Sequence, residues 1–396
     1  MKKIVVSVLI FCTSLTALAE DLPTVSDLFN PLLTGVPSLS IGPDAVGGGM
    51  GDIGVATTPD VNSQHWNSSK YAQASSTAGF AFSYTPWLRS LGVNDIDLAY
   101  LAGYYKISDL AGTVSSSLRY FSLGEIQLRE SATAVPIPVK PYELAFDLGY
   151  SRMLSAHFSM GVAFRFIVSD LSARQEEYYP GYSFSTDING YYSLPIDIKT
   201  GESKFGFGFN LSNLGTKISY DKGNTSNFLP TDLRLGVSYL VPFDRYNRLL
   251  VSIDVDKLLV PSRKSKFTEG YDPADPDTWA MGETQYNNLS VMKGLAWSFA
   301  DAPGGFKEEM SEINLALGLE YAYNEQFFAR AGYHNESANK GNRKYFTVGA
   351  GFKMSAFKLD VGYVVSVAQN NPLDQTLRFS LAFDVDGIKA LADRSK

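Results

Sequence analysis

The sequence predicts an all-β fold, a transmembrane antiparallel β-barrel of about 14 strands with an N-terminal plug in its lumen. Three observations predict it: apolar side chains recur with a period of two, charged residues occupy the opposite face of the same stretches, and short and long connections alternate. The composition agrees, since 45% of the 396 residues are hydrophobic, 13% are aromatic and only 19% are charged. So high an apolar fraction excludes a disordered chain.

Residues 1–19 have the features of a signal peptide. A basic start precedes an apolar segment at residues 4–12, and residues 17–19 supply a small-x-small cleavage site. Cys12 is the only cysteine and leaves with this segment, so the mature chain is expected to have no disulfide and no thiol ligand. The 32 basic and 41 acidic side chains that remain give a net charge of −9, which does not favour nucleic-acid binding.

Residues 20–77 lack the alternation and are too apolar for a free tail. We therefore predict that they fold as a plug inside the lumen. The residues singled out for this plug are Gly47, Gly48, Gly49, Gly51, Asp52, Trp66 and Asn67. The glycine-rich part resembles a phosphate-binding loop in composition only, because it lacks the preceding strand and the Lys-Ser/Thr ending.

Residues 78–386 are expected to form the barrel, because fourteen stretches in them alternate between an apolar and a polar face. A soluble sandwich would bury the apolar face, whereas a membrane barrel turns it to the lipid and turns the polar face to the lumen. The absence of an apolar run of about 18 residues in the mature chain excludes a helical membrane protein. The stretches are 78–91, 95–107, 110–124, 141–154, 157–170, 183–194, 204–220, 231–242, 247–259, 311–323, 326–336, 345–355, 357–367 and 376–386.

The connections between these stretches are alternately short and long. Short ones lie at 107–110, 154–156, 242–245, 324–325 and 355–356, and long ones at 125–140, 171–182, 221–230, 260–310, 337–343 and 368–374. Outer-membrane barrels have short periplasmic turns and longer extracellular loops. We therefore expect an outer-membrane protein with both termini in the periplasm, including a C-terminal tail at 387–396.

Charged residues predicted to face the lumen have two readings, a polar conduction path or mutual pairing with one another and with the plug. Pairing is favoured because both signs are mixed and unpaired charge in a confined lumen is costly. These residues are Glu143, Asp147, Arg165, Arg234, Asp254, Asp256, Glu320, Arg330, Lys358, Asp360 and Arg378. Inward glycines at 206, 208, 349 and 351 are predicted to leave space for the plug.

No constellation in the sequence predicts catalysis, a cofactor or a metal. The three histidines, His65, His157 and His334, have no ligand spacing with one another or with other candidates. His157 lies at a predicted turn beside Ser155 and Ser159, but serine is common in this chain, so their proximity does not favour catalysis.

The connection at 260–310 is the most informative loop, because fifty residues between strands are usually functional or disordered. Its seven large aromatics argue for an ordered cap or a protein-binding surface, and an aromatic girdle at the membrane interface would explain only some of them. We predict that residues of this loop contact a partner together with Trp87, which lies at another part of the same rim. The loop residues are Tyr271, Asp272, Asp275, Asp277, Trp279, Tyr286, Trp297, Phe299 and Phe306.

Several stretches resemble the FadL superfamily of outer-membrane transporters and, more closely, the PorV family, its members in the type IX secretion system. They are GPDAVGGGMGDIGVATTPDVNSQHWN (42–67), YTPWLRSLGVNDIDLAYLAGYYK (84–106), LRYFSLGEI (118–126), SNLGTKISYD (212–221), PTDLRLG (230–236) and YNRLLVSIDVDKLLVP (246–261). Two departures stand out. Asn67-Ser68-Ser69 replaces the Asn-Pro-Ala common in superfamily plugs, and thirteen residues follow Phe383 at the end of the last strand.

The resemblance implies a non-enzymatic role without a cofactor. Proteins of this family bind the C-terminal signal domains of secreted cargo that leave the giant translocon barrel, and they escort the cargo to the surface sortase or attachment complex. The expected partners are thus that translocon, that complex, the cargo, and the lipid and lipopolysaccharide of the outer membrane. The alternative is a FadL-like transporter of hydrophobic small molecules such as long-chain fatty acids or aromatic hydrocarbons.

Overall fold

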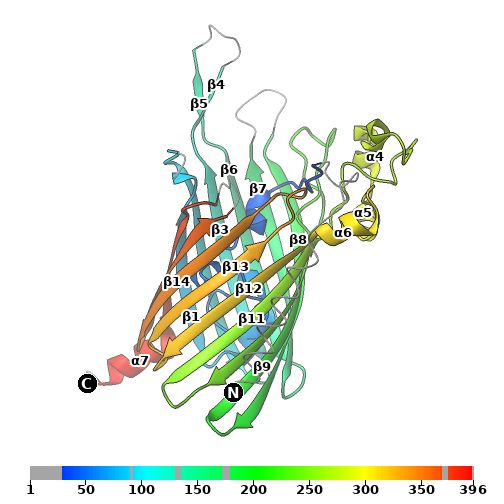
Figure 1. Cartoon of the computed structure of the whole chain (residues 1–396). Coiled ribbons are helices and arrows are strands. Elements are labelled where there is room, and N and C mark those ends of the chain that lie inside the picture. The colour runs from blue at the N-terminus through cyan, green and yellow to red at the C-terminus, as the bar shows by residue number, and fades with distance from the viewer. Residues whose placement is uncertain (1–28, 90–91, 130–134, 172–178, 368–372, 395–396) are drawn as a thin grey trace.

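The computed structural model describes residues 29–89, 92–129, 135–171, 179–367 and 373–394, so the predicted signal peptide lies outside the described residues. Fourteen described strands close into one antiparallel barrel (Figure 1). The barrel closes where β1 (Ala78–Pro86) pairs with β16 (Leu377–Asp384). The predicted fold class, a transmembrane barrel of 14 strands, is confirmed.

The other strands begin and end close to their predicted limits. They are β2 (Ile96–Ser108), β3 (Gly112–Leu123), β6 (Tyr142–Met153), β7 (Phe158–Asp170), β8 (Gly181–Ile198), β9 (Gly201–Gly215), β10 (Asp232–Pro242), β11 (Asn247–Leu258), β12 (Ile313–Tyr323), β13 (Phe327–Asn335), β14 (Lys344–Met354) and β15 (Phe357–Ser366). The largest difference is between β8 and β9, where both strands extend further towards their shared turn. Gly201 makes that tight turn possible, because its φ of 136° is rarely open to other residues.

The two faces of each strand have opposite chemistry. Phe164 and Phe184 are 65% and 63% exposed on the outer surface, whereas Arg165 and Ser185, the next residue in each strand, are buried inside. The same alternation runs through β16, where Phe379 is exposed and Arg378 and Ser380 are buried. An apolar outside and a polar inside are what a bilayer requires of a barrel.

The two rims of the barrel differ in the length of their connections. One rim, the turn rim, carries the short links 109–111, 154–157, 199–200, 243–246, 324–326 and 355–356. The opposite loop rim carries the described parts of the long links 87–95, 124–141, 171–180, 216–231, 259–312, 336–343 and 367–376. The alternation predicted from the sequence is therefore present.

Three features at the rims were not predicted. The link after β3 contains a short hairpin, β4 (Ile126–Leu128) with β5 (Ile137–Val139), which extends beyond the loop rim (Figure 1). Four short helices occupy the link before β12, as described below. At the turn rim, α7 (Val385–Arg394) forms where the sequence predicted the end of the last strand and a tail at 387–396, and Asp386 in it accepts a hydrogen bond of 2.6 Å from the amide of Thr77. Among the described residues, none of the helices is long and apolar enough to cross a membrane.

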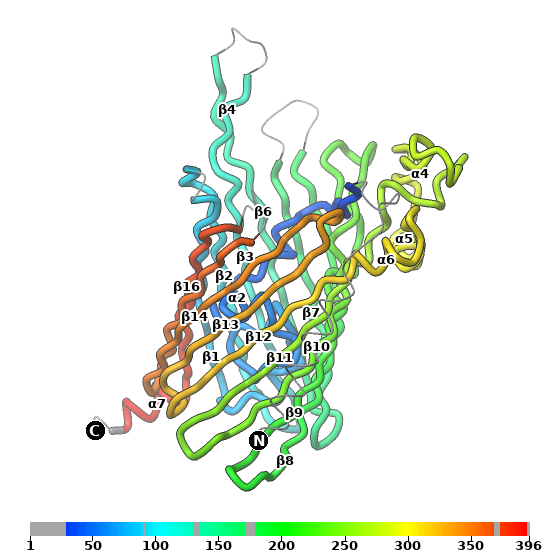
Figure 2. Tube along the Cα trace, in the orientation of Figure 1, coloured from blue at the N-terminus to red at the C-terminus, as the bar shows by residue number. Residues whose placement is uncertain are grey.

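The N-terminal segment passes through the lumen from the loop rim to the turn rim. At its described beginning, the amide of Asn30 donates to the carbonyl of Asn339 in a long loop (2.9 Å), and at its end the chain enters β1 at the turn rim. Between these points lie the short helices η3 (Pro37–Ser40), α2 (Ala45–Gly48), α3 (Ser63–Trp66) and η4 (Ser68–Gln73). Figure 2 shows this blue segment enclosed by the strands.

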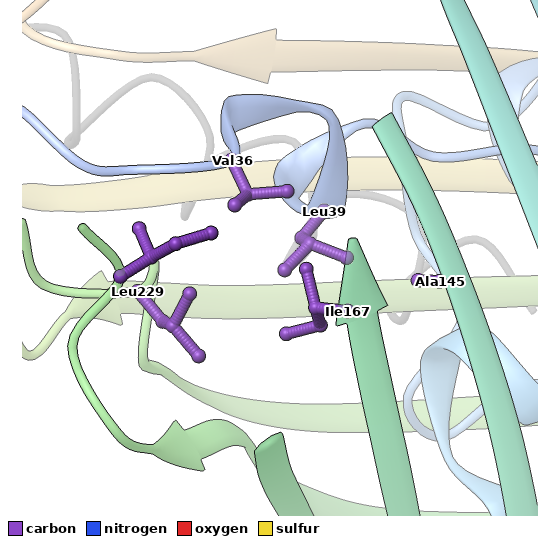
Figure 3. Close-up of a cluster of buried hydrophobic side chains, with 6 residues drawn as sticks. Val36, Leu39, Ala145, Ile167 and Leu229 are labelled. Carbon is purple, nitrogen blue, oxygen red and sulfur yellow. The ribbon is translucent and has the colours of Figure 1, made fainter. Parts of the chain in front are cut away.

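An apolar cluster packs the part of this segment nearest the loop rim against the barrel wall. Val36 and Leu39 pack on Ala145 of β6, Ile167 of β7 and Leu229 of the link before β10 (Figure 3). Each of these side chains is almost completely buried. Their burial favours a docked plug over a segment that moves freely in the lumen.

Candidate functional site

The plug is built on one capped turn of helix. Asp44 precedes α2, and its carboxylate accepts hydrogen bonds from the amides of Val46 (3.0 Å) and Gly47 (2.9 Å). The other oxygen of Asp44 accepts a 2.7 Å bond from the indole nitrogen of Trp66. A cap of this kind satisfies amides that a helix start leaves without partners, and here it also joins two distant parts of the plug.

The plug is bonded to the barrel wall through its backbone. Asp254 of β11 accepts bonds from the amides of Gly54 (2.9 Å) and Val55 (3.0 Å). Asp52 forms an ion pair with Arg378 of β16 and accepts a 2.5 Å bond from the hydroxyl of Tyr345. Because these contacts reach strands on different parts of the barrel, they fix the plug across the lumen.

Glycines of the wall allow the plug backbone to approach. A Cβ at Gly332 would lie 2.1 Å from the carbonyl carbon of Met50, and one at Gly208 would lie 2.4 Å from the carbonyl oxygen of Val55. A Cβ at Gly206 would lie 2.8 Å from the carbonyl oxygen of Ala56, and one at Gly349 would lie 3.1 Å from the Cα of Gly49. The prediction that inward glycines leave space for the plug is confirmed at 206, 208 and 349, whereas Gly351 instead faces the side chains of Asp360 and Arg330.

The inward charges are paired, as predicted. Arg165 binds Asp147 (2.7 Å) and Asp187 (2.9 Å), and Arg330 binds Glu320 (2.7 Å) and Asp360 (2.8 Å). The remaining members of the predicted set contact the plug or a polar neighbour, and their partners are Ser38 for Glu143, Asp232 for Arg234, Asn314 for Asp256, Asp360 for Lys358, and Asp52 for Arg378. Ion pairs, together with hydrogen bonds to the plug and to polar neighbours, therefore account for these charges.

A cavity of about 260 Å³ lies between the plug and the loop rim. Trp87, Phe121 and Leu373 give it an apolar side, and Arg234 and Arg343 are among its charged lining residues. Trp87 packs edge to face on Phe121, with 5.7 Å between ring centroids. The structure thus places Trp87 over the lumen, apart from the other predicted contact residues. A second cavity of about 360 Å³ lies on the turn-rim side of the plug.

The link between β11 and β12 folds into four short helices, η6 (Pro276–Trp279), α4 (Glu283–Asn288), α5 (Val291–Trp297) and α6 (Phe306–Ser311). We call residues 260–312 the helical loop; it projects from one side of the loop rim (Figure 1). The loop has a core of its own, in which Tyr286, Met281 and Leu289 pack on Phe228 and Val260. The prediction that this loop is ordered is confirmed.

Cations surround the central tyrosine of this core. The guanidinium of Arg263 lies 3.5 Å from the ring centroid of Tyr286, and the ammonium of Lys217 donates a 2.8 Å bond to the carbonyl of the same residue. Burial, with a smaller contribution from Arg263, lowers the pKa of Lys217 to about 8. These contacts tie the helical loop to the neighbouring link at 216–231.

The predicted contact residues of the helical loop divide by exposure. Trp279 and Tyr286 are buried, whereas Trp297 and Tyr271 are half-buried and pack with tilted rings on Phe267 and Trp279 respectively. Fully on the surface are Phe299, Phe306, Asp272, Asp275 and Asp277. Sequence reasoning missed Met292 and Met310, which are 66% and 48% exposed. Nothing in the local sequence distinguishes them from methionines that fill a core.

Three carboxylates at the base of the helical loop are brought together by the fold. Single oxygens of Asp301, Glu309 and Glu312 all lie within 4.8 Å of one another. They form the one group in the described residues whose composition and spacing suit a metal ion. No spacing in the sequence marks them.

These features define a class of protein: a membrane-spanning β-barrel of the outer-membrane type that is closed by an internal plug and has a folded loop at one rim. The chain belongs to the PorV family, because the family model described as "Type IX secretion system protein PorV" matches residues 26–265. Most of the helical loop lies beyond the matched residues.

Solved structures similar to this chain include hydrocarbon channels and a FadL homologue. The TodX deltaS2S3 mutant, a monoaromatic hydrocarbon channel, is 11% identical over 86% of this chain and 98% of its own, with a TM-score of 0.50. The Pseudomonas putida toluene transporter TodX is 9% identical over 90% of this chain and 99% of its own (TM-score 0.49), and a Pseudomonas aeruginosa FadL homologue is 11% identical over the same shares (TM-score 0.42). Among curated protein sequences, none matches this chain.

Proposed function

We propose that this protein is a non-enzymatic component of the type IX secretion system that binds C-terminal signal domains of cargo leaving the translocon. It passes the bound cargo to the surface sortase or attachment complex. Membership of the PorV family supports the secretion role. In this proposal the loop rim faces the outside of the cell.

The observation that carries the proposal is a group of exposed apolar side chains on a packed loop. Phe306 is 80% exposed and Phe299 is 52% exposed, although the core beside them is well formed. Exposed apolar side chains that lie together on a folded unit are typical of protein-binding surfaces, and the four most exposed large ones of this loop all fall within residues 292–310. We call Met292, Phe299, Phe306 and Met310 the apolar group of the helical loop.

Exposed acidic residues on the same loop support a role in steering. Asp272, Asp275 and Asp277 lie around η6 with their side chains in solvent. Charges at the edge of an interface mainly raise the rate of encounter with a partner of opposite charge, and salt weakens that effect. A basic surface on the cargo or the translocon would fit them.

The test is affinity purification from native outer membrane. The wild-type protein should recover a much larger β-barrel, a surface protease-like sortase and secreted proteins that share a C-terminal β-domain. Phe299→Ser combined with Phe306→Ser should keep the barrel folded and reduce cargo affinity, with a loss of about 2 kcal/mol or roughly 30-fold if the pair is a hot spot.

A matched control is available at the same rim. Val135 is 84% exposed but lies in the hairpin beyond β3, so Val135→Ser removes an exposed apolar side chain away from the helical loop. It should leave cargo recovery unchanged. Equal recovery by the double variant and the wild type would refute the role given to the apolar group.

The alternative function is transport of hydrophobic small molecules, and the lumen cavities favour it. Together, apolar Trp87, Phe121 and Leu373 could contact such a ligand on the loop-rim side of the plug. A deletion strain that secretes its cargo normally but fails to take up fatty acids or aromatic hydrocarbons would replace the shuttle function with this one.

A further inference from the structure

The base of the helical loop contains more negative than positive charge in a buried place. Four carboxylates meet there, from Asp301, Glu308, Glu309 and Glu312, and each is less than one-tenth exposed. Two ammonium groups form ion pairs with three of these carboxylates. Lys340 contacts Glu308 (2.7 Å) and Glu312 (2.9 Å), and Lys257 contacts Glu312 (2.5 Å) and Glu309 (3.3 Å).

One carboxylate oxygen in this cluster has no partner. Asp301 is completely buried, and its Oδ2 accepts a 2.7 Å bond from the amide of Ser262. Its Oδ1 has no hydrogen-bond partner in the described structure. Neither lysine contacts it within ion-pair distance. A buried carboxylate oxygen left in this way is costly unless a cation or a proton compensates it.

The geometry around Asp301 suits a cation. One oxygen each from Asp301, Glu309 and Glu312 lies within 4.8 Å of the other two, which is the span of two oxygen ligands on opposite sides of one calcium ion. The four carboxylates and two lysines leave two negative charges, so one divalent ion would neutralise the cluster. Carboxylate oxygens are the ligands that Ca²⁺ prefers, and Mg²⁺ uses fewer of them.

We propose that Asp301, Glu309 and Glu312 form a Ca²⁺ site that fastens the helical loop to the barrel. Asp301 also binds the amide at the start of the loop, Glu309 accepts a 2.7 Å bond from the amide of Ala302, and Glu312 leads into β12. The ion therefore holds the end of the loop together, and the bond from Ser262 to Asp301 links this site to the beginning of the loop.

The experiment uses the full-length protein in detergent, freed of metal with EDTA and titrated with CaCl₂ in a calorimeter. The wild type should bind one Ca²⁺ per chain, and Ca²⁺ should slow proteolysis within residues 263–300. Asp301→Asn keeps the bond from Ser262 but removes the charge, so it should weaken binding by at least about tenfold. Glu309→Gln is a second variant with the same expected direction, and slower gel migration after boiling checks that both barrels fold.

Asp275→Asn is the matched control, because it removes a carboxylate of the same loop that is exposed to solvent. It should bind Ca²⁺ like the wild type. No binding by the wild type, or equal binding by Asp301→Asn, would overturn the site and mean that Asp301 shares a proton with its neighbours. Neither result depends on cargo binding, so the site and the proposed function can fail separately.

Discussion

Single glycines of the barrel wall decide how closely the plug can pack. At Gly332 the nearest plug atoms are backbone atoms of Met50 and Gly51, which cannot move aside as the end of a side chain could. A methyl group at this position must therefore displace the plug or bend β13. Overpacking of this kind usually costs about 1–3 kcal/mol.

We predict that Gly332→Ala loosens the plug without opening the barrel. Amide hydrogen exchange of residues 44–55 should become faster, because their bonds to Asp254 and Thr347 depend on close contact with the wall. The control is Ala331→Val, which adds more volume at the adjacent residue on the outer face. Unchanged exchange in Gly332→Ala would mean that the plug does not rest on this glycine.

Aromatic residues of the helical loop look alike in sequence but have opposite roles. Tyr286 is fully buried under Arg263 and beside Phe228, whereas Phe306 is 80% exposed. The sequence could predict that so many aromatics form an ordered unit. It could not predict which of them face inward, because that choice depends on contacts with the separate link at 216–231.

These roles predict different effects of truncation. Tyr286→Ala should destabilise the helical loop by about 3 kcal/mol, since it empties a packed core, and Phe306→Ala should leave loop stability nearly unchanged. Limited proteolysis within residues 263–300 measures the difference in the isolated protein. Similar cleavage of both variants would show that the loop core described here does not control its stability.

Strands were predictable because their signal is local. A period of two needs only neighbouring residues, and the bilayer imposes it on every spanning strand. The helix α7 was missed for a related reason. The alternation of apolar and polar residues in the last strand continues into the first residues of α7, so the predicted strand ended at 386. Val385, Ile388 and Leu391 do have helical spacing, but three residues at the end of a chain are a weak signal.

The three carboxylates at the base of the helical loop show what local sequence spacing cannot predict. The spacing of histidines and cysteines in the sequence predicts no metal ligand set, and carboxylates are too common for their spacing to be informative. Asp301 and Glu312 come together through a chain reversal within the helical loop, and Lys340 reaches them from the next loop. Only the fold reveals that cluster.

The outer face of β16 gives a direct test of the lipid assignment. Phe379 is 41% exposed on the apolar surface and pairs with Val361 in the middle of β15. Phe379→Arg should cost about 2–4 kcal/mol, because the charge is placed in the hydrocarbon layer. Ser380→Ala removes one contact to the plug and should cost about 1 kcal/mol. Urea unfolding in lipid vesicles measures both, and a milder effect at Phe379 would reverse the assigned faces.

At the scale of the whole molecule, closure and plugging are two separate properties. Closure follows from the pairing of β1 with β16, which leaves no free edge in the barrel. Plugging follows from contacts between residues hundreds of positions apart, such as Asp52 with Arg378. The sequence predicted that a plug exists, from the apolar segment before the first strand. Its path from the loop rim to the turn rim required the structure.

Together these properties predict a barrel that conducts poorly. The plug bonds to several strands, and Arg165, Arg330 and Arg378 form ion pairs with carboxylates beside it, so bonded groups obstruct the described lumen. In planar bilayers the full-length protein should show little steady current.

Asp52→Ala breaks the contacts to Arg378 and Tyr345 and should produce brief openings, because the other contacts still hold the plug most of the time. Asp97→Ala removes a carboxylate paired with Arg89 at the loop rim, away from the plug, and should stay silent. Large steady currents from the wild type would contradict a fixed plug and would favour the transporter alternative over the shuttle.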